Sequence, residues 1–241
     1  FWYNKDSRHY YFMGKDNLIF HTIFWPGQLM GYDSNLHLPD ITSINMFLNL
    51  EGKQFSKSRG ISIPIEEIVN NYGNDPVRFY LTLIMPELKD SSFTWTDFIH
   101  KNNEILVGNF GNLIHRVLSF AQGMDIKAVS KYALSKECKR EIQKTFSSSR
   151  EFLEKCEFKC YLDNILELSS YGNKFIQQEQ FWTLKKDNPE KLHKVMKQLY
   201  GLIISLGYLT VPLLPETSRN IFNLLGLEPQ TTWPELSKEV E

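Results

Sequence analysis

A change in hydrophobic pattern near Ser92 constrains the fold of this chain more than any other feature. Before it, from His9 to about Met85, short apolar runs alternate with helical periodicities, which is typical of an α/β layer with parallel strands. After it, only long helical periodicities follow, which indicates a helix bundle. We therefore predict an α/β domain over residues 1–92 and an all-α domain over residues 93–241, in a molecule that is helical for most of its length.

The first part opens with a strand, a turn and a helix. Tyr10–Met13 is an aromatic and apolar run that ends at Gly14. Asp16 is then expected to cap a helix that stops at Trp25, just before Pro26. A second apolar run leads into a polar loop, and two helices come after it, so that these three elements are expected at residues 44–50, 65–72 and 76–85.

The second part opens with a long amphipathic helix. Thr94 and Asp97 have the spacing of a capping box, and Gly123 is expected to end the helix. Asn112 and Arg116, four residues apart, lie on the side opposite its apolar stripe. Further helices are predicted over residues 136–156, 159–178, 189–210 and 216–225.

Composition narrows the class of protein. With 42% hydrophobic residues the chain can bury a full core, and its formal charge of −1 gives no general attraction to nucleic acid. Cys138, Cys156 and Cys160 form no C-x-x-C pair, so we expect reduced thiols in a cytoplasmic protein and no bound zinc. The uncharged stretch Gln198–Pro215 is predicted to be a buried helix that ends at Pro212 rather than a membrane span. No feature predicts an oligomeric state.

The polar loop Gly52–Gly60 has the composition of a phosphate site. It combines glycines, two serine hydroxyls and several cations between two apolar stretches. Glycine lets the backbone approach an anion, hydroxyls and amides donate hydrogen bonds to it, and lysine adds a movable charge. ATP is therefore the first ligand to expect.

Several segments, in the right order, resemble one family. Phe55–Gly60 looks like the class I signature loop written KMSKS, and Phe12–Asn17 with Phe20-His21 and Trp25-Pro26 looks like the segment that lines the amino-acid and adenosine sites. Two helical segments, around Asn112–Arg116 and Phe181-Trp182, resemble anticodon-reading segments. The chain thus resembles the C-terminal half of a class I methionyl-tRNA synthetase. The resemblance implies the second half of a Rossmann-type nucleotide-binding domain, followed by an anticodon-binding helix bundle.

The resemblance implies a two-step reaction. Methionine carboxylate attacks the α-phosphorus of ATP, which binds with Mg²⁺, and the adenylate then acylates the terminal ribose of methionine tRNA. Lys57 would stabilise the charge that builds up on pyrophosphate, with Ser56, Ser58 and Lys53 steadying the loop. The alternative is that Lys57 is an ordinary solvated lysine of a surface loop.

The resemblance implies that two positions at the end of the first strand bind ATP. Gly14 would let the nucleotide approach the backbone, and the Asp16 carboxylate would accept hydrogen bonds from the ribose hydroxyls. Capping of the following helix by Asp16 is compatible with that contact.

The methionine pocket is implied on one helix face. Asn17, His21 and Trp25 follow at intervals of four, and they supply an amide, an imidazole and an aromatic wall, with Phe20 as a supporting residue. Aromatic rings contact thioether sulfur favourably. On the residues alone, such a stripe is more often ordinary core.

The anticodon site is implied in the bundle. An exposed Trp182 ring would stack on an unpaired base, while Asn112 and Arg116 would hydrogen-bond base edges. The alternative is a polar pair on the bundle surface beside a half-buried tryptophan. Lysines near Trp182 would add phosphate contacts, although such a run is more often a solvated helix face; they are Lys185, Lys186, Lys191, Lys194 and Lys197.

Departures from the family pattern leave two alternatives open. Gln54 and Phe55 replace the first lysine and the methionine of the signature, and Lys53 stands one residue earlier. The chain begins in mid-pattern at Phe1 and has no HIGH segment, so we expect a fragment that is inactive alone. One alternative is a non-catalytic tRNA-binding module with a vestigial loop. The other is a synthetase for leucine, valine or cysteine, against which His21 and Trp25 speak.

Overall fold

The computed structural model describes residues 1–228 and divides them into two compact units. The first unit comprises residues 1–63 and 84–95, and the second comprises residues 64–83 and everything from Thr96 onward. The helices at residues 64–83 therefore pack with the helical unit, although their place in the chain suggested the α/β part. Residues 229–241 of the expected second domain lie outside the described residues.

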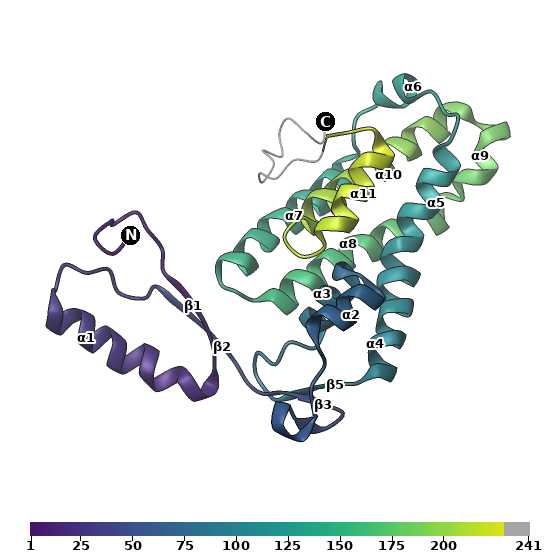
Figure 1. Ribbon diagram of the computed structural model, residues 1–241. Coiled ribbons are helices and arrows are strands. Elements are labelled where there is room, and N and C mark those ends of the chain that lie inside the picture. Colours follow the sequence, from purple (N-terminus) through teal and green to yellow (C-terminus); the bar gives the residue numbers. More distant parts are fainter. Residues whose placement is uncertain (229–241) are drawn as a thin grey trace. The chain divides into compact units, whose positions relative to one another are not determined.

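The first unit contains two small sheets (Figure 1). Strand β1 (Tyr10–Gly14) pairs in parallel with β2 (Ile41–Asn45), and helix α1 (Trp25–Tyr32) lies between them in the chain. Strand β3 (Leu48–Leu50) pairs in parallel with β5 (Ser91–Phe93) and antiparallel with β4 (Lys53–Gln54). Parallel pairs joined through a helix are the layering expected of an α/β nucleotide-binding fold.

The apolar run at residues 44–50, expected as one element, is split between the two sheets. Its backbone turns away from strand pairing at Met46 and Phe47. The N–H of Met46 donates to the carbonyl of Pro86 at 2.7 Å, and the N–H of Phe47 donates to the carboxylate of Asp90 at 3.0 Å. These two hydrogen bonds to the segment before β5 take Met46 and Phe47 out of strand pairing. As a result β2 ends before them and β3 begins after them.

The prediction that the first helix stops at Trp25 is wrong. After a 3-10 turn η1 (Lys15–Asn17), the chain is helical through the π-helix η2 (Phe20–Phe24) and on through α1 to Tyr32. An α-helix would place the Pro26 ring against the carbonyl four residues earlier. The wider π turn, in which the N–H of Trp25 bonds to the carbonyl of Phe20, accommodates that ring.

The second unit is a bundle of helices. Its first long helix runs without a break from α4 (Trp95–Lys101) through the π-helix η4 (Asn102–Gly111) to α5 (Asn112–Ala121), and Gly123 follows it with φ +78°, as predicted. The other helices are α2 (Ile65–Tyr72), α3 (Asn74–Leu83), α6 (Ile126–Ser130), α7 (Lys136–Glu154), α8 (Phe158–Glu179), α9 (Phe181–Asp187), α10 (Pro189–Thr210) and α11 (Pro215–Leu225).

Helices α8 and α10 form the centre of the bundle. Most of the C-terminal half of α10 is buried, as predicted, and its bounds are those expected from the sequence. Small residues let neighbours approach: a methyl group at Gly172 of α8 would lie 2.8 Å from the Leu113 side chain, and one at Gly201 of α10 would lie 2.7 Å from that of Leu134. Among the described residues, no helix is both long and apolar enough to cross a membrane.

Candidate active site and anticodon-binding site

The Ser56–Gly60 loop is closed by its own backbone. Ser56 and Ile61 form an isolated antiparallel bridge, in which each N–H donates to the other's carbonyl at 2.8 and 2.9 Å. Lys57–Arg59 forms one 3-10 turn between them, and the Ser56 and Ser58 hydroxyl oxygens lie 3.2 Å apart. Gly60 has φ +69°, a left-handed conformation that glycine adopts at no steric cost. The loop is thus an ordered projection beyond the β3–β4 hairpin.

The cations of this loop are available to an anion. Lys53, Lys57 and Arg59 are exposed, and within residues 1–228 none of the three has a carboxylate oxygen at ion-pair distance. Successive residues of a strand point to opposite faces, so Lys53 projects away from the side on which Gln54 lies.

The end of β1 presents an exposed carboxylate next to an open glycine. A Cβ at Gly14 would meet nothing within 4 Å, so a ligand can approach the backbone there. Asp16 is exposed in the turn that follows, and no side chain caps this turn, whose N-cap residue is Gly14. The expectation that Asp16 caps the helix is therefore wrong, and its carboxylate is left for other partners.

Lys15, between these two positions, is already paired. Its ammonium lies 2.9 Å from the Asp90 carboxylate and 4.1 Å from the centre of the Phe47 ring. The backbone N–H of Phe47 and, after it, the Lys15 ammonium hold the pKa of the Asp90 carboxyl below its usual value. This ion pair fastens the end of β1 to the loop before β5.

His21 and Trp25 both approach Tyr11 of β1. The indole N–H of Trp25 donates to the Tyr11 hydroxyl at 3.1 Å, and the Tyr11 and His21 rings meet edge to face with centroids 6.1 Å apart. His21 Nδ1 lies 3.0 Å from the carbonyl of Asn17, so one of its ring nitrogens is engaged locally. Sequence reasoning missed Tyr11, whose only signal was its place in the strand that leads to Gly14.

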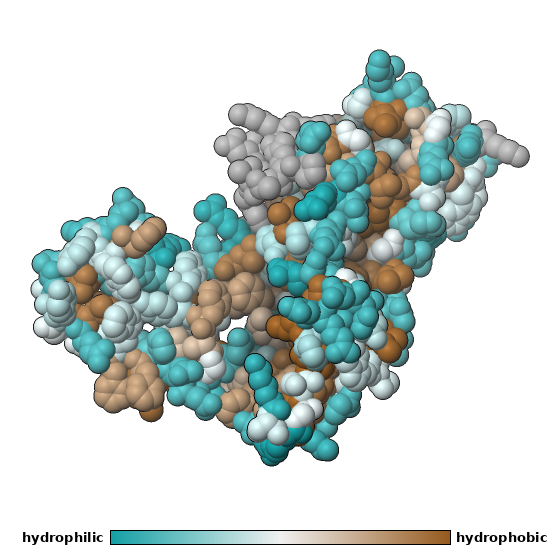
Figure 2. All heavy atoms as spheres, in the orientation of Figure 1, coloured by the Kyte–Doolittle hydropathy of each residue, from teal (hydrophilic) through white to brown (hydrophobic). Residues whose placement is uncertain are grey.

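Phe20, the fourth residue predicted to line the methionine pocket, packs against Phe24 at the surface. Its side chain is 60% exposed, and its ring packs against that of Phe24 with centroids 5.6 Å apart. With Ile19 and Ile23, these two residues give the helix an apolar outer face. In Figure 2, brown and tan side chains lie among teal and pale ones in the region of α1.

Arg116 and Trp182 come together from different helices. The guanidinium carbon of Arg116 lies 5.6 Å from the centre of the Trp182 ring, which is 46% exposed. The neighbouring Phe181 is buried, and its ring packs edge to face on Phe120, one turn beyond Arg116, at 4.5 Å. Phe181 thus anchors α9 on α5, while Trp182 keeps nearly half of its surface exposed beside Arg116.

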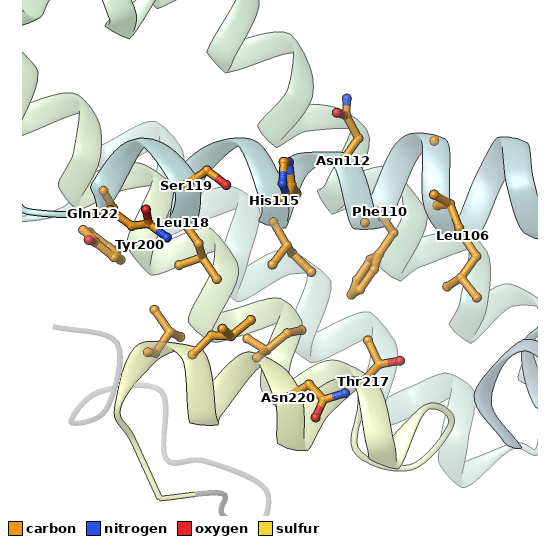
Figure 3. A pocket seen from close by; sticks show the side chains of 18 of the residues that line it. Leu106, Phe110, Asn112, His115, Leu118, Ser119, Gln122, Tyr200, Thr217 and Asn220 are labelled. Carbon is orange, nitrogen blue, oxygen red and sulfur yellow. The ribbon is translucent and has the colours of Figure 1, made fainter. Parts of the chain in front are cut away.

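Asn112 lies one helical turn before Arg116 and is exposed. In Figure 3 its amide points away from Thr217 and Asn220 of α11, whereas Phe110 and Leu118 point toward that helix. The apolar groove between α5 and α11, of about 1040 Å³, has Asn112 at its margin and is a feature separate from the Arg116 and Trp182 pair.

Most of the lysines near Trp182 have partners. Lys191 pairs with Glu179 at 2.9 Å and Lys194 with Glu190 at 2.6 Å. Lys185 instead lies over the Phe120 ring at 5.9 Å. Within residues 1–228, no group of three or more His, Cys, Asp or Glu residues is placed to hold a metal ion.

Family models match nearly the whole chain. The family model of class I tRNA synthetases of the M type matches residues 1–118, and the model of the anticodon-binding domain of methionyl-tRNA ligase matches residues 127–240. The chain is 36% identical to the methionine–tRNA ligase of Thermococcus kodakarensis over 97% of its own length and 33% of that protein. It is also 36% identical to that of Thermomicrobium roseum, over 93% of this chain and 39% of that protein.

Solved structures agree on the fold. Mycobacterium tuberculosis methionyl-tRNA synthetase, in complex with methionyl-adenylate, superposes with a TM-score of 0.77 at 23% identity, over 91% of this chain and 44% of that one. The free form of that enzyme superposes with a TM-score of 0.75 at 22% identity, over 92% of this chain and 44% of that one. The chain spans about a third of the length of curated relatives such as the Thermococcus kodakarensis protein. It belongs to the methionyl-tRNA synthetase family, and it matches that family's class I synthetase model over residues 1–118 and its anticodon-binding model over residues 127–240.

Proposed function

We propose that the protein to which this chain belongs is a methionine–tRNA ligase, which activates methionine with ATP and transfers it to methionine tRNA. The observation that carries this proposal is the convergence of His21 and Trp25 on Tyr11, beside the open glycine at the end of β1. An aromatic wall held by a hydrogen bond, with an imidazole beside it, suits an unbranched thioether. It offers little to the branched side chains of leucine or valine.

The activation step needs alignment of reactants and positive charge on the departing pyrophosphate. In our proposal Asp16 accepts hydrogen bonds from the ribose of ATP beside Gly14, and the methionine side chain lies against Trp25. The methionine carboxylate then attacks the α-phosphorus and displaces pyrophosphate. Mg²⁺ enters as the counter-ion of ATP.

The mobile charge for this step comes from the loop. Lys57 is proposed to meet the pyrophosphate, because its ammonium is exposed and has no carboxylate at ion-pair distance within residues 1–228. Ser56 and Ser58 hold the turn, and Lys53 adds charge from β4. Electrostatic groups of this kind typically contribute 10²- to 10³-fold each to the rate.

Recognition of tRNA is assigned to residues 93–241, and the nucleotide chemistry to residues 1–92 together with the rest of the catalytic domain. A base of the anticodon would stack on Trp182, while Arg116 and Asn112 donate to its edge. The three cysteines form no disulfide within residues 1–228, which favours a cytoplasmic protein.

Two measurements test the function. In the full-length gene product, methionine should drive ATP–pyrophosphate exchange, whereas leucine, valine and cysteine should not. Lys57→Ala should lower the exchange rate about 10²-fold or more, while Lys89→Ala, an exposed lysine in the same unit, should not change it. Absence of exchange with every amino acid would overturn the enzymatic assignment and favour a non-catalytic tRNA-binding module.

The 241-residue chain itself tests the second half of the proposal. It should bind methionine tRNA more tightly than the same tRNA with its CAU anticodon changed, measured at moderate salt because phosphate contacts are screened. Equal affinity for both would contradict anticodon reading by this domain.

A further inference from the structure

The turn between β3 and β4 is hydrogen-bonded to β5 and to Trp95, all within the first unit. The N–H of Glu51 donates to the carbonyl of Phe93 at 2.9 Å, and the Glu51 carboxylate accepts from the N–H of Trp95 at 2.9 Å. The N–H of Gly52 donates to the Ser92 hydroxyl at 2.9 Å. Both residues of this two-residue turn are therefore held by β5 and the first residue of α4.

The backbone of the turn makes Glu51 an unusual choice. Glu51 has φ +49° and Gly52 has φ +75°, the left-handed pair that a two-residue hairpin turn requires. Glycine and asparagine are the residues that favour such positions, because a longer side chain with a Cβ is strained there. The turn geometry alone does not call for glutamate, so its value lies in what its carboxylate binds.

That carboxylate serves the helix and the hairpin together. Trp95 is the first residue of α4, and the first N–H groups of a helix have no partner within it. A negative side chain is also favoured at this end of a helix. The bond from Trp95 thus satisfies a helix N–H group and holds the Glu51 side chain in one position.

Only four residues separate Glu51 from Ser56, where the backbone bridge closes the Lys57 loop. Two of these residues form β4, whose register against β3 is set at the turn. We propose that Glu51 is a positioning residue for the Ser56–Gly60 loop: its carboxylate, bound to the Trp95 N–H, fixes the hairpin from which the loop projects. The kinetic part of this inference rests on the proposed function, and the structural part does not.

The structural part is tested by hydrogen exchange on the 241-residue chain. Glu51→Ala should speed exchange of the amides from Lys53 to Ile61 by about fivefold, the factor expected for one lost hydrogen bond. Amides of β1 and β2 should not change. Glu51→Gln keeps an oxygen that accepts from Trp95 and should restore slow exchange.

Two further variants complete this test. Ser92→Ala removes the Gly52 contact and leaves Glu51 in place, so it reports on the same hairpin if Glu51→Ala does not fold. Glu66→Ala removes an exposed carboxylate from the first turn of α2 and is the matched control. Unchanged exchange at the loop in Glu51→Ala, or in Ser92→Ala if Glu51→Ala does not fold, would overturn the inference.

The kinetic part uses ATP–pyrophosphate exchange by the full-length gene product. Glu51→Ala should raise KM for ATP several-fold and leave KM for methionine unchanged, and Glu51→Gln should rescue it. A general loss of stability would not separate the two substrates in this way. Equal changes in both KM values would overturn the inference. A wild-type protein with no ATP–pyrophosphate exchange would instead refute the proposed function, and the hydrogen-exchange result would still stand.

Discussion

The indole N–H of Trp25 donates to the hydroxyl of Tyr11 at 3.1 Å, and this bond ties the helix after β1 back to the strand itself. Trp2 also packs edge to face on Trp25, with the two ring centroids 5.8 Å apart. Trp25 thus contacts two aromatic residues. A wall fixed in this way costs less conformational entropy when a flexible ligand packs against it.

Tyr11→Phe should weaken methionine binding without unfolding the protein. The substitution removes the hydroxyl that orients Trp25, at a cost of about 1 kcal/mol, so KM for methionine in the exchange assay should rise about fivefold. KM for ATP should stay the same. Tyr10→Phe, on the opposite face of the same strand, is the control; an equal effect of both variants would show that Tyr11 has no particular role.

Trp182→Ala should reduce affinity for methionine tRNA by about 5- to 150-fold, the range for one lost base-stacking contact. Arg116→Ala should reduce it as well, because the guanidinium lies over the same ring. Arg150→Ala, an exposed arginine of α7 paired with Glu154, is the control. Binding curves for Trp182→Ala and Arg116→Ala that coincide with wild type would remove this surface from the anticodon site.

Stability at low pH should depend on Asp90. Because the folded state holds the pKa of this carboxyl below its usual value, its contribution is present above the unfolded pKa, which is about 3.9 for Asp. That contribution is lost as pH falls through the lower pKa of the folded state. Thermal melts from pH 3 to pH 7 should show Asp90→Asn less stable than wild type near neutrality, with a gap that closes toward pH 3. A gap of constant size would mean that the charge of Asp90 is unimportant.

The three cysteines should differ in reactivity. Burial raises the pKa of the Cys138 thiol to about 12 and also raises that of Cys156, whereas Cys160 is exposed. Since the thiolate is the nucleophile, alkylation of the folded protein at pH 8 should be faster at Cys160 by about tenfold or more. Mass spectrometry of the digested protein reports each site, and urea should abolish the difference. Fast alkylation of Cys138 in the folded chain would contradict its burial.

Long periodic elements were predictable from the sequence, because one apolar face specifies them. The bounds of α10 match the expected ones, and the sequence also singled out Arg116 and Trp182, which the fold brings together. The resemblance to anticodon-reading segments is what singled out these two residues in the sequence. The role proposed for them remains a prediction.

What sequence reasoning missed depended on contacts between distant segments. The break between β2 and β3 is made by Pro86 and Asp90, some forty residues later. The prediction that the helix stops at Trp25 rested on the rule that proline ends a helix. The wider π turns before Pro26 remove the steric clash on which that rule depends. Tyr11 carries no motif, since its partner is fourteen residues away along the chain.

The π segment Asn102–Gly111 determines the direction, around the helix axis, in which every later residue of the long helix points. Each π turn holds one residue more than an α turn, so if the same residues closed as an ordinary α-helix, which turns about 100° per residue, Asn112 and Arg116 would rotate about 100° around the axis for each wide turn lost. Arg116 would then leave the Trp182 ring although every side chain of the site was still present. The hydrogen-bond pattern within those ten residues therefore matters to the site alongside the identity of its side chains.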